Sequence, residues 1–342
     1  MKSALTKTPA IRHLTLACLL AGTALSGTLQ AQETCSYRGE LDAMYCDANK
    51  DLVADAPSDP KKFRNPNTLV FAFTPVEDPS IYEKLFQPFM AHLSQCVGKK
   101  TLFFAVQSNS AQIEAMRSGR LHLAAFSTGP TNFAVNIAGA VPFAIRGTEK
   151  GAEGMMVQMI VRKDSPYKTL ADLKGKKVAH TSPSSNSGNL APRALFPALG
   201  LTPDKDYQVV YSGKHDQSVL GVKSGDYDAA PVASDVLAHM IERGAAKPDD
   251  FNIIYTSDRF PTDAYAYAHD LEPKLAEKIK QCFFNYRIPP DMAKGLGGDR
   301  FLPADYKKDW DLVRKVAIGA GQNLSRAGYE AERAKDEARS KK

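Results

Sequence analysis

Residues 177–196, KVAHTSPSSNSGNLAPRALF, are the most informative stretch of the chain. Their apolar and β-branched start predicts a short buried strand, and their last nine residues predict a helix. Free backbone N–H groups and the helix dipole make such a helix start suitable for an anion, and Ser185, Asn186 and Ser187 would add neutral donors there. An ordinary Ser/Asn cap in a turn explains the same pattern equally well.

The same strand–helix rhythm runs through most of the chain. Strands are predicted over 68–73, 101–106, 121–126, 140–145, 155–162, 177–180, 207–211, 227–232 and 251–255. Helices are predicted over 81–95, 111–118, 131–137, 170–175, 188–196, 215–222, 275–286 and 304–320. This alternation favours βα units on mainly parallel sheets. One βα set, a second set and a return of the chain predict an α/β protein of two lobes.

The lobe boundaries follow from that order. Lobe 1 is predicted to comprise 67–163 plus about 265–342, and lobe 2 to comprise 164–264. A cleft between two such lobes is a natural place for a ligand.

The composition is that of an ordinary globular protein. The chain has 342 residues, 43% of them hydrophobic and 24% charged, which excludes disorder, collagen and coiled coil for the chain as a whole. The formal net charge is +6, but Lys2, Lys7 and Arg12 lie in the first 31 residues, which hold no acid, so the remainder has a charge of +3. This weak surplus forms no basic stripe, and no nucleic-acid partner is expected.

Residues 1–31 predict a secretory signal peptide. Their basic start precedes an apolar run at 14–25 that is too short for a membrane anchor, and the LQA at 29–31 suits cleavage. A lipoprotein anchored through Cys18 fits less well, because the apolar run should precede the modified cysteine. We therefore expect a soluble, periplasmic monomer that begins near Gln32.

Export to an oxidising compartment changes the meaning of the remaining cysteines. Cys35, Cys46, Cys96 and Cys282 predict two disulfides, for which three pairings are possible. We prefer Cys35–Cys46 with Cys96–Cys282, because the first pair lies in one small segment. A thiol-based ligand site is the rival interpretation, although no zinc-type spacing is present.

The polar, loop-rich extension at 32–66 contains a candidate calcium loop. Oxygen ligands at alternate positions of a tight turn suit a hard cation, and here they are Asp47, Asn49, Asp51 and Asp55. Leu52 stands where such loops usually have glycine, and no Glu occupies the twelfth position. A solvated acidic loop tied by a disulfide is the alternative, so a structural calcium ion is the single cofactor considered.

Several segments agree in order and spacing with one known family. They are FTPVEDP at 73–79, LAAFSTGP at 123–130, KDSP at 163–166, the loop at 181–188, GKHD at 213–216 and GDYDA at 225–229. Together they resemble the periplasmic phosphate/phosphite/phosphonate-binding proteins of ABC importers over about residues 67–320. The resemblance implies a two-lobed type II periplasmic binding protein with its ligand cleft between the lobes. The extension lies outside it.

The resemblance also assigns a site in the second lobe. The family's Ser/Thr helix start falls on Ser185, Asn186 and Ser187, with Asn186 in place of a threonine. A family histidine matches His215, which could donate to an anionic oxygen. A cap or a surface position is the alternative for a histidine at a helix start.

The first lobe is expected to contribute a smaller set of residues. A family tyrosine falls on Phe126 or its neighbours, so its hydroxyl is lost, and Ser127 and Thr128 are candidates to replace it. Thr74 and Tyr82 are further candidates; a turn residue and a half-buried helix residue are the alternatives for these two positions.

Two carboxylates bear on which ligand is taken. In family members that take an aminoalkyl phosphonate, acidic residues face the ammonium, and the resemblance places these near Asp235 and Asp263. Helix-cap or loop aspartates explain them equally well. Phosphite, phosphate, a small alkylphosphonate or an arsenic oxyanion therefore all stay open.

The leading functional hypothesis is a receptor that closes on a small oxyanion and delivers it to an ABC permease. A second hypothesis is a periplasmic oxyanion sensor that feeds a membrane histidine kinase. An enzyme acting on phosphate esters is a third, but no Gly-x-Ser-x-Gly elbow, His-Glu-x-x-His or Walker loop is present in the sequence.

Overall fold

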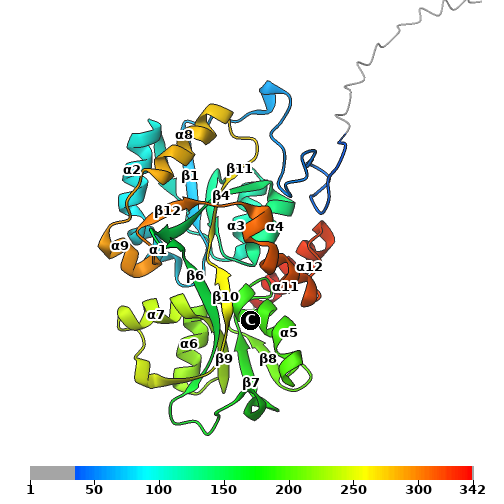
Figure 1. Ribbon diagram of the computed structural model, residues 1–342, viewed down its shortest axis with the longest axis vertical. Coiled ribbons are helices and arrows are strands. Elements are labelled where there is room, and N and C mark those ends of the chain that lie inside the picture. Colours follow the sequence, from blue (N-terminus) through cyan, green and yellow to red (C-terminus); the bar gives the residue numbers. More distant parts are fainter. Residues whose placement is uncertain (1–34, 341–342) are drawn as a thin grey trace, which may run out of the picture. The chain divides into compact units, whose positions relative to one another are not determined.

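The computed structural model describes residues 35–340, so the predicted signal peptide lies outside the described residues. Within this range the chain forms two mixed β-sheets with helices packed on them (Figure 1). The predicted α/β class is therefore observed, with antiparallel strands added to the parallel ones.

The first sheet runs in the order β12-β4-β11-β3-β1-β2, with β5 paired to β4. Its strands are β1 (Thr68–Phe73), β2 (Lys100–Phe103), β3 (Leu123–Phe126), β4 (Ala140–Thr148), β5 (Gly151–Ala152), β11 (Ala264–Ala268) and β12 (Arg300–Pro303). Strand β1 is parallel to β2 and β3, whereas β11 lies antiparallel between β3 and β4. The register pairs Phe71 of β1 with Leu123 of β3.

The second sheet runs in the order β10-β6-β9-β7-β8. Its strands are β6 (Gly154–Arg162), β7 (Lys177–His180), β8 (Gln208–Tyr211), β9 (Ala229–Ala233) and β10 (Phe251–Pro261). Strand β7 is parallel to β8 and β9, and β6 is antiparallel to β9 and β10. The carboxyl end of β7 carries the loop that leads to residue 185.

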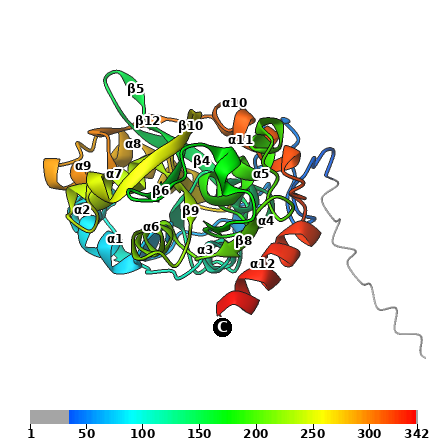
Figure 2. The same ribbon diagram turned by 90° about the horizontal axis from the view of Figure 1, so that it is seen from below.

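The helices lie around the strands of the two sheets (Figure 2). Their bounds are α1 (Pro79–Leu85), α2 (Gln87–Val97), α3 (Asn109–Arg117), α4 (Pro130–Ala138), α5 (Ala191–Leu195), α6 (His215–Ser224), α7 (Ser234–Glu242), α8 (Pro273–Phe284), α9 (Pro290–Leu296), α10 (Tyr306–Asp309), α11 (Asp311–Gly319) and α12 (Arg326–Ser340). The two helices predicted over 81–95 and 304–320 are each broken into two.

Strand β1 shows why the first sheet is covered on both faces. Leu69, Phe71 and Phe73 point to one face, where they pack with side chains of α2 and α8. Ala72 points to the other face and packs in the cluster that includes α3 and α4. Because both faces of the strand are largely covered, its sequence is apolar from Leu69 onward rather than alternating.

The chain passes between the sheets twice. It leaves the first sheet after β4 and β5 and enters the second at β6, and it returns between β10 and β11. Strand β6 thus belongs to the second sheet although it precedes the boundary that we predict at 163. The extents of the lobes themselves stay a prediction.

The extension is part of the folded unit. Both predicted disulfides are present, Cys35–Cys46 within the extension and Cys96–Cys282 between α2 and α8. Tyr45 is buried in the core, and the Asp42 carboxylate forms an ion pair with Arg326 at the start of α12. The extension and α12 therefore hold one another against the first sheet.

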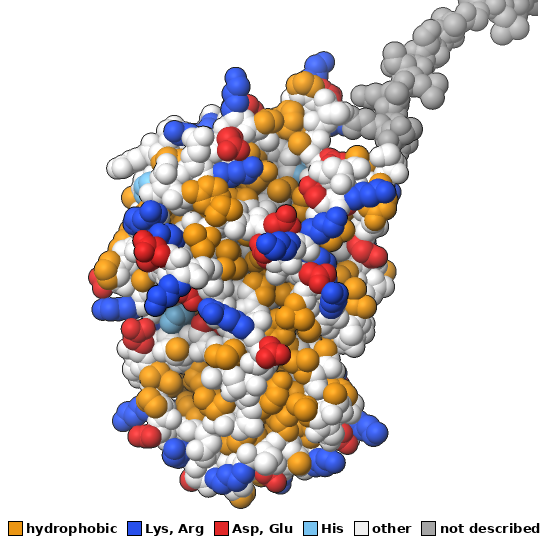
Figure 3. Space-filling model, viewed as in Figure 1, with side chains coloured by type: hydrophobic (Ala, Val, Ile, Leu, Met, Phe, Trp, Pro, Cys, Tyr) orange, Lys and Arg blue, Asp and Glu red, His pale blue; other side chains and the backbone are white. Residues whose placement is uncertain are grey.

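The described surface is mixed in charge. Figure 3 shows Lys and Arg side chains interspersed with Asp and Glu over the face drawn, without a patch of one sign. Among the described residues, no helix has both the length and the apolarity needed to cross a bilayer.

Candidate functional site

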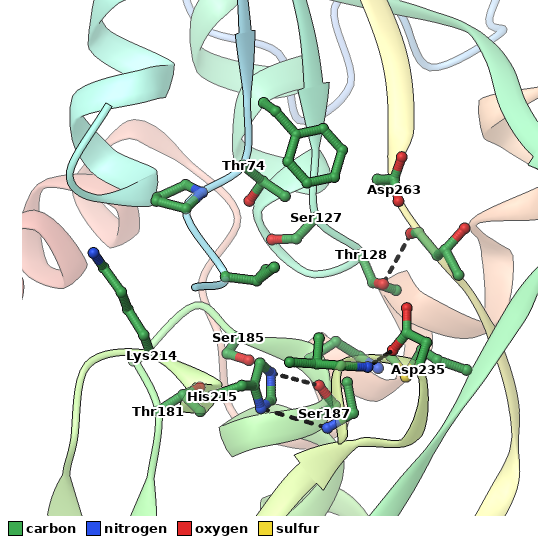
Figure 4. A pocket seen from close by; sticks show the side chains of 18 of the residues that line it. Thr74, Ser127, Thr128, Thr181, Ser185, Ser187, Lys214, His215, Asp235 and Asp263 are labelled. Carbon is green, nitrogen blue, oxygen red and sulfur yellow. Dashed lines mark hydrogen bonds between the residues drawn. The ribbon is translucent and has the colours of Figure 1, made fainter. Parts of the chain in front are cut away.

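A cavity lies between the two sheets, where the loops after β1, β3, β7 and β9 meet (Figure 4). The space open to the centre of a water molecule is about 70 Å³. All ten residues that the sequence offers as ligand contacts line it: Thr74, Tyr82, Ser127, Thr128, Ser185, Asn186, Ser187, His215, Asp235 and Asp263. Segments separated by up to 189 positions along the chain are thus brought to one site, although their contact with a ligand stays a prediction.

The loop after β7 begins a helix at the cavity wall. Ser185 is the cap: its hydroxyl oxygen accepts a hydrogen bond from the Gly188 N–H at 3.1 Å. A π-helical turn, η3 (Asn186–Leu190), follows and continues into α5. The N–H groups of Asn186 and Ser187 lie in the first turn, where a helix offers no internal acceptor. The cap and the anion cradle, which we posed as alternatives, are therefore compatible.

Asn186 has an unusual environment. Its side chain is 2% exposed, lines the cavity, and has no hydrogen-bond partner for either amide atom among the described residues. A buried amide without partners is unfavourable by about 1–3 kcal/mol per atom. The site therefore offers a ligand both a donor and an acceptor at this position.

Ser187 and His215 act as a pair. His215 Nδ1 accepts the Ala233 N–H at 3.4 Å, so the ring proton is assigned to Nε2, which donates to the Ser187 hydroxyl at 3.2 Å. Burial lowers the pKa of His215 to about 4, which keeps the ring neutral. The hydroxyl proton of Ser187 is then left to donate into the cavity. In this arrangement His215 positions Ser187, and direct contact of the ring with an anion stays a prediction.

The first sheet contributes a hydrogen-bonded chain across the cleft. The Thr74 hydroxyl donates to Asn109 Oδ1 at 3.3 Å, and Asn109 Nδ2 donates to the hydroxyls of Ser182 and Ser184 at 3.3 and 3.4 Å. Ser127 lines the same wall. Asn109 is thus a link between the two lobes, and nothing in its local sequence marks it as such.

The Thr128 hydroxyl has a different role. It donates to the backbone carbonyls of Pro261 and Thr262 at 2.8 and 2.9 Å, where the chain returns from the second sheet. Its proton is engaged there, so it fastens the crossing segment at the edge of the cavity.

Tyr82 belongs to a second connection between the lobes. Its hydroxyl donates to Glu77 at 2.9 Å, and Glu77 forms an ion pair with Arg243 at the end of α7. Burial raises the pKa of Glu77, while Arg243 opposes the shift. Breaking this ion pair would leave a buried carboxylate unpaired, so the pair favours the closed cleft.

The two candidate carboxylates differ in their surroundings. Asp263 accepts hydrogen bonds from Arg146 Nη2 at 2.5 Å and from Nε at 3.2 Å, in a bidentate pair that is buried. Asp235 lies in the first turn of α7 and accepts from the Val236 N–H at 3.0 Å. Sequence reasoning missed Arg146, and the available signal was a lone arginine inside the otherwise uncharged strand β4.

The candidate calcium loop is folded on itself. The Asp47 carboxylate accepts the N–H groups of Asp51 and Leu52, and Asp55 accepts the N–H of Ala48. Leu52 has φ 72°, the left-handed region that glycine would occupy in a calcium loop. No group of three His, Cys, Asp or Glu within the described part of the chain is arranged to hold a metal ion, and calcium at this loop stays a prediction.

Known proteins of similar sequence point to one family. A family model described as the periplasmic substrate-binding protein of phosphonate ABC transporters matches residues 71–310. The phosphate-import protein PhnD of Mycolicibacterium smegmatis is 30% identical over 232 residues, 64% of this chain and 71% of that protein. The phosphonates-binding periplasmic protein of Escherichia coli is 25% identical over 256 residues, 73% and 76% of the two chains.

Solved structures share the fold. PhnD1 of Prochlorococcus marinus, solved in complex with methylphosphonate, matches with a TM-score of 0.68 at 19% identity, over 75% of this chain and 99% of that one. The binding component of a phosphonate ABC transporter from Pseudomonas aeruginosa also gives 0.68, at 21% identity, over 80% and 96%. The predicted two-lobed type II fold is confirmed.

These matches decide between the three functional hypotheses. The relatives are substrate-binding components of ABC importers rather than enzymes, and none of the matches named here favours the sensor. The family model matches well over half of the chain, including every candidate ligand residue. The chain therefore belongs to the family of periplasmic substrate-binding proteins of phosphonate ABC transporters.

Proposed function

We propose that the protein binds a small phosphorus oxyanion, a phosphonate, phosphite or phosphate, between its lobes and delivers it to the permease of an ABC importer. The observation that carries the proposal is the first turn of the helix at 185–188, which lines a cavity between the two sheets. Backbone N–H groups and neutral hydroxyls bind an oxyanion through directional hydrogen bonds without a buried counter-ion. Such a site can release its ligand as well as hold it.

The size of the cavity supports a small ligand. Each water molecule needs roughly 10–15 Å³ of space open to its centre, so the cavity of about 70 Å³ holds roughly five to seven water molecules. A ligand built on one phosphorus atom would take the place of a few of these water molecules.

The contacts between the lobes support binding by closure. His215 N–H donates to the Val76 carbonyl at 3.0 Å, which joins the loops after β8 and β1. The chain through Asn109 and the ion pair of Glu77 with Arg243 add two more contacts of this kind. A ligand that bridges the same two walls would stabilise the closed form, and the permease would then recognise that form.

The remaining parts of the proposal concern the setting. The family is periplasmic, and the predicted signal peptide at 1–31 would supply export. We expect the mature chain to act as a monomer, so light scattering after gel filtration should return the mass of one chain.

Calorimetric titration of the mature protein with phosphite, methylphosphonate and phosphate tests the proposal. At least one should bind, and Ser187→Ala should weaken that binding by about 1.5–3 kcal/mol, the value of a donor to a buried anion. Ser118→Ala is the matched control, since Ser118 is exposed outside the cavity. Failure of all three anions to bind, or equal affinity in Ser187→Ala, would overturn the proposal.

A further inference from the structure

Of the two carboxylates that line the cavity, one is neutralised and the other is not. Asp263 is held by two of the three guanidinium nitrogens of Arg146, and the third donates to the Gly297 carbonyl at 3.3 Å. In the described part of the chain, Asp235 forms no ion pair, and a main-chain N–H is its hydrogen-bond donor. A half-buried carboxylate without a cation thus faces the space assigned to an anion.

The groups around Asp235 do not neutralise it. Arg146 is near enough to act on it electrostatically but is committed to Asp263, whose own charge opposes that effect. His239, one turn later on α7, and His215 on α6 are both kept neutral, because burial lowers the pKa of each to about 4. Tyr82, from α1, is also buried and uncharged. Burial raises the pKa of Asp235, although Arg146 opposes the shift.

An unpaired carboxylate beside an oxyanion selects between oxyanions by whether they carry a proton. An ionised carboxylate only accepts hydrogen bonds, and so does a fully ionised oxyanion, so the two repel. One proton between them converts the contact into a charge-assisted hydrogen bond. Either a protonated Asp235 donates to a dianion, or an ionised Asp235 accepts from a monoanion. The two descriptions are equivalent, because the complex contains the same one proton in both.

Oxyanions differ in whether they can bring that proton. A phosphate monoester keeps its second proton up to a pKa of about 6, and the second ionisation of related phosphorus oxyacids also lies near neutral pH. Sulfate and sulfonates have the same shape but hold no proton in this range. The Asn186 amide oxygen, which also lacks a donor among the described residues, adds to the demand for a hydrogen on the ligand.

We propose that Asp235 is a specificity-determining residue, which makes this cavity select tetrahedral oxyanions that share a proton with it and reject sulfate and sulfonates. The inference rests on the proposed function of the cavity and deepens it. Arg146 disfavours the other use of these carboxylates, because the Asp263 carboxylate is already neutralised and leaves Asp235 without a second carboxylate for holding a ligand ammonium. An amino group on the ligand should therefore add little affinity.

The test compares isosteric ligands by calorimetry on the mature protein. Methylphosphonate should bind at least about a hundredfold more tightly than methanesulfonate. Asp235→Asn, which keeps the shape and removes the obligate acceptor, should narrow this ratio by about tenfold or more. Asp249→Asn is the control, since Asp249 is exposed outside the cavity, and it should leave the ratio unchanged.

A second measurement does not depend on any variant. Titration of the wild-type protein with methylphosphonate at pH 8 and above, in buffers of different ionisation enthalpy, counts the protons taken up on binding. The proposal expects uptake that approaches one proton as the pH rises, because the free ligand has lost the proton that the complex needs.

Each outcome separates the two claims. An unchanged ratio in Asp235→Asn, or binding without proton uptake, overturns the role of Asp235 while leaving oxyanion binding in place. If 2-aminoethylphosphonate binds more than about tenfold tighter than ethylphosphonate, and Asp235→Asn removes the gain, the residue pairs with an ammonium and the proposal is wrong. Failure of every phosphorus oxyanion to bind overturns the proposed function instead.

Discussion

Gly129 allows a direct test of closure. It caps α4 on the first lobe and faces the loop after β7 on the second. A Cβ placed on Gly129 would lie 2.2 Å from the Ser184 carbonyl oxygen and 2.8 Å from the Asn186 nitrogen, whereas real Cβ atoms essentially never come within 3.0 Å. Both neighbours are main-chain atoms that cannot rotate aside. Gly129→Ala should therefore force the lobes apart by most of an ångström.

The size of the effect follows from this geometry. The backbone of Gly129 is helical, with φ −73° and ψ −51°, so alanine introduces no backbone strain of its own. The clash exists only in the closed form, where overpacking typically costs about 1–3 kcal/mol. We expect the Kd for the bound oxyanion to rise by about 5- to 150-fold. The melting temperature of the ligand-free protein should change little if its cleft is open in solution.

Calorimetry measures the affinity, and small-angle scattering with and without ligand measures closure. Gly319→Ala on α11 is the matched control, because nothing lies within 4 Å of the added Cβ. Wild-type affinity and a wild-type change in scattering for Gly129→Ala would refute the inference that the ligand is bound in this closed arrangement.

Three further predictions concern charge, pH and metal. Arg243→Gln should weaken oxyanion binding by about 1–3 kcal/mol, because the closed form would then bury Glu77 unpaired; equal affinity would show that the pair does not favour closure. Stability to urea should fall from pH 7 to pH 5, because four buried histidines have a folded pKa of about 4 and stay neutral where the unfolded chain takes up a proton near pH 6.5. Below that pH each of them lowers the free energy of unfolding by about 1.4 kcal/mol per pH unit, and unchanged stability would contradict their burial. These histidines are His122, His180, His215 and His239. If the loop at 47–55 holds calcium, a chelator should lower the melting temperature of the protein, and identical melting with and without it would argue against the ion.

The strand–helix order could be predicted because it is local. The strands at 68–73 and 177–180 have the predicted bounds, since short apolar runs flanked by loop residues are visible in the sequence itself. Strand β11, with the sequence AYAYA, was missed. Its strand character depends on β3 and β4, far away along the chain, and no local pattern records that pairing.

Helix breaks show a signal that was present but not used. The helix predicted over 81–95 stops at Phe86, which is fully buried, and restarts at Gln87 with Pro88 in its first turn. Proline has no N–H to donate and favours the first turn of a helix, so Pro88 marks the break. Trp310 separates α10 from α11, and no proline marks that break.

Some residues of the candidate site could likewise be predicted from local sequence, whereas their partners could not. Ser185 and Ser187 could be chosen from the sequence, because a helix start after a strand is a local feature. The bond from His215 to Ser187 and the pairing of Arg146 with Asp263 join positions 28 and 117 residues apart. Which partner a buried charge has is decided by the tertiary fold, and spacing alone does not reveal it.

The ion pair of Arg146 with Asp263 has a mechanical consequence. Arg146 lies on β4, just before the chain leaves the first sheet, and Asp263 lies between β10 and β11, just after it returns. The ion pair thus links the two segments that connect the lobes and about which the lobes must pivot. A substitution at either position would alter the stiffness of this joint, and with it the ligand's residence time, together with the local charge. Engineers who wish to retune selectivity without disturbing that motion should therefore begin at Asp235, which is tethered to neither strand.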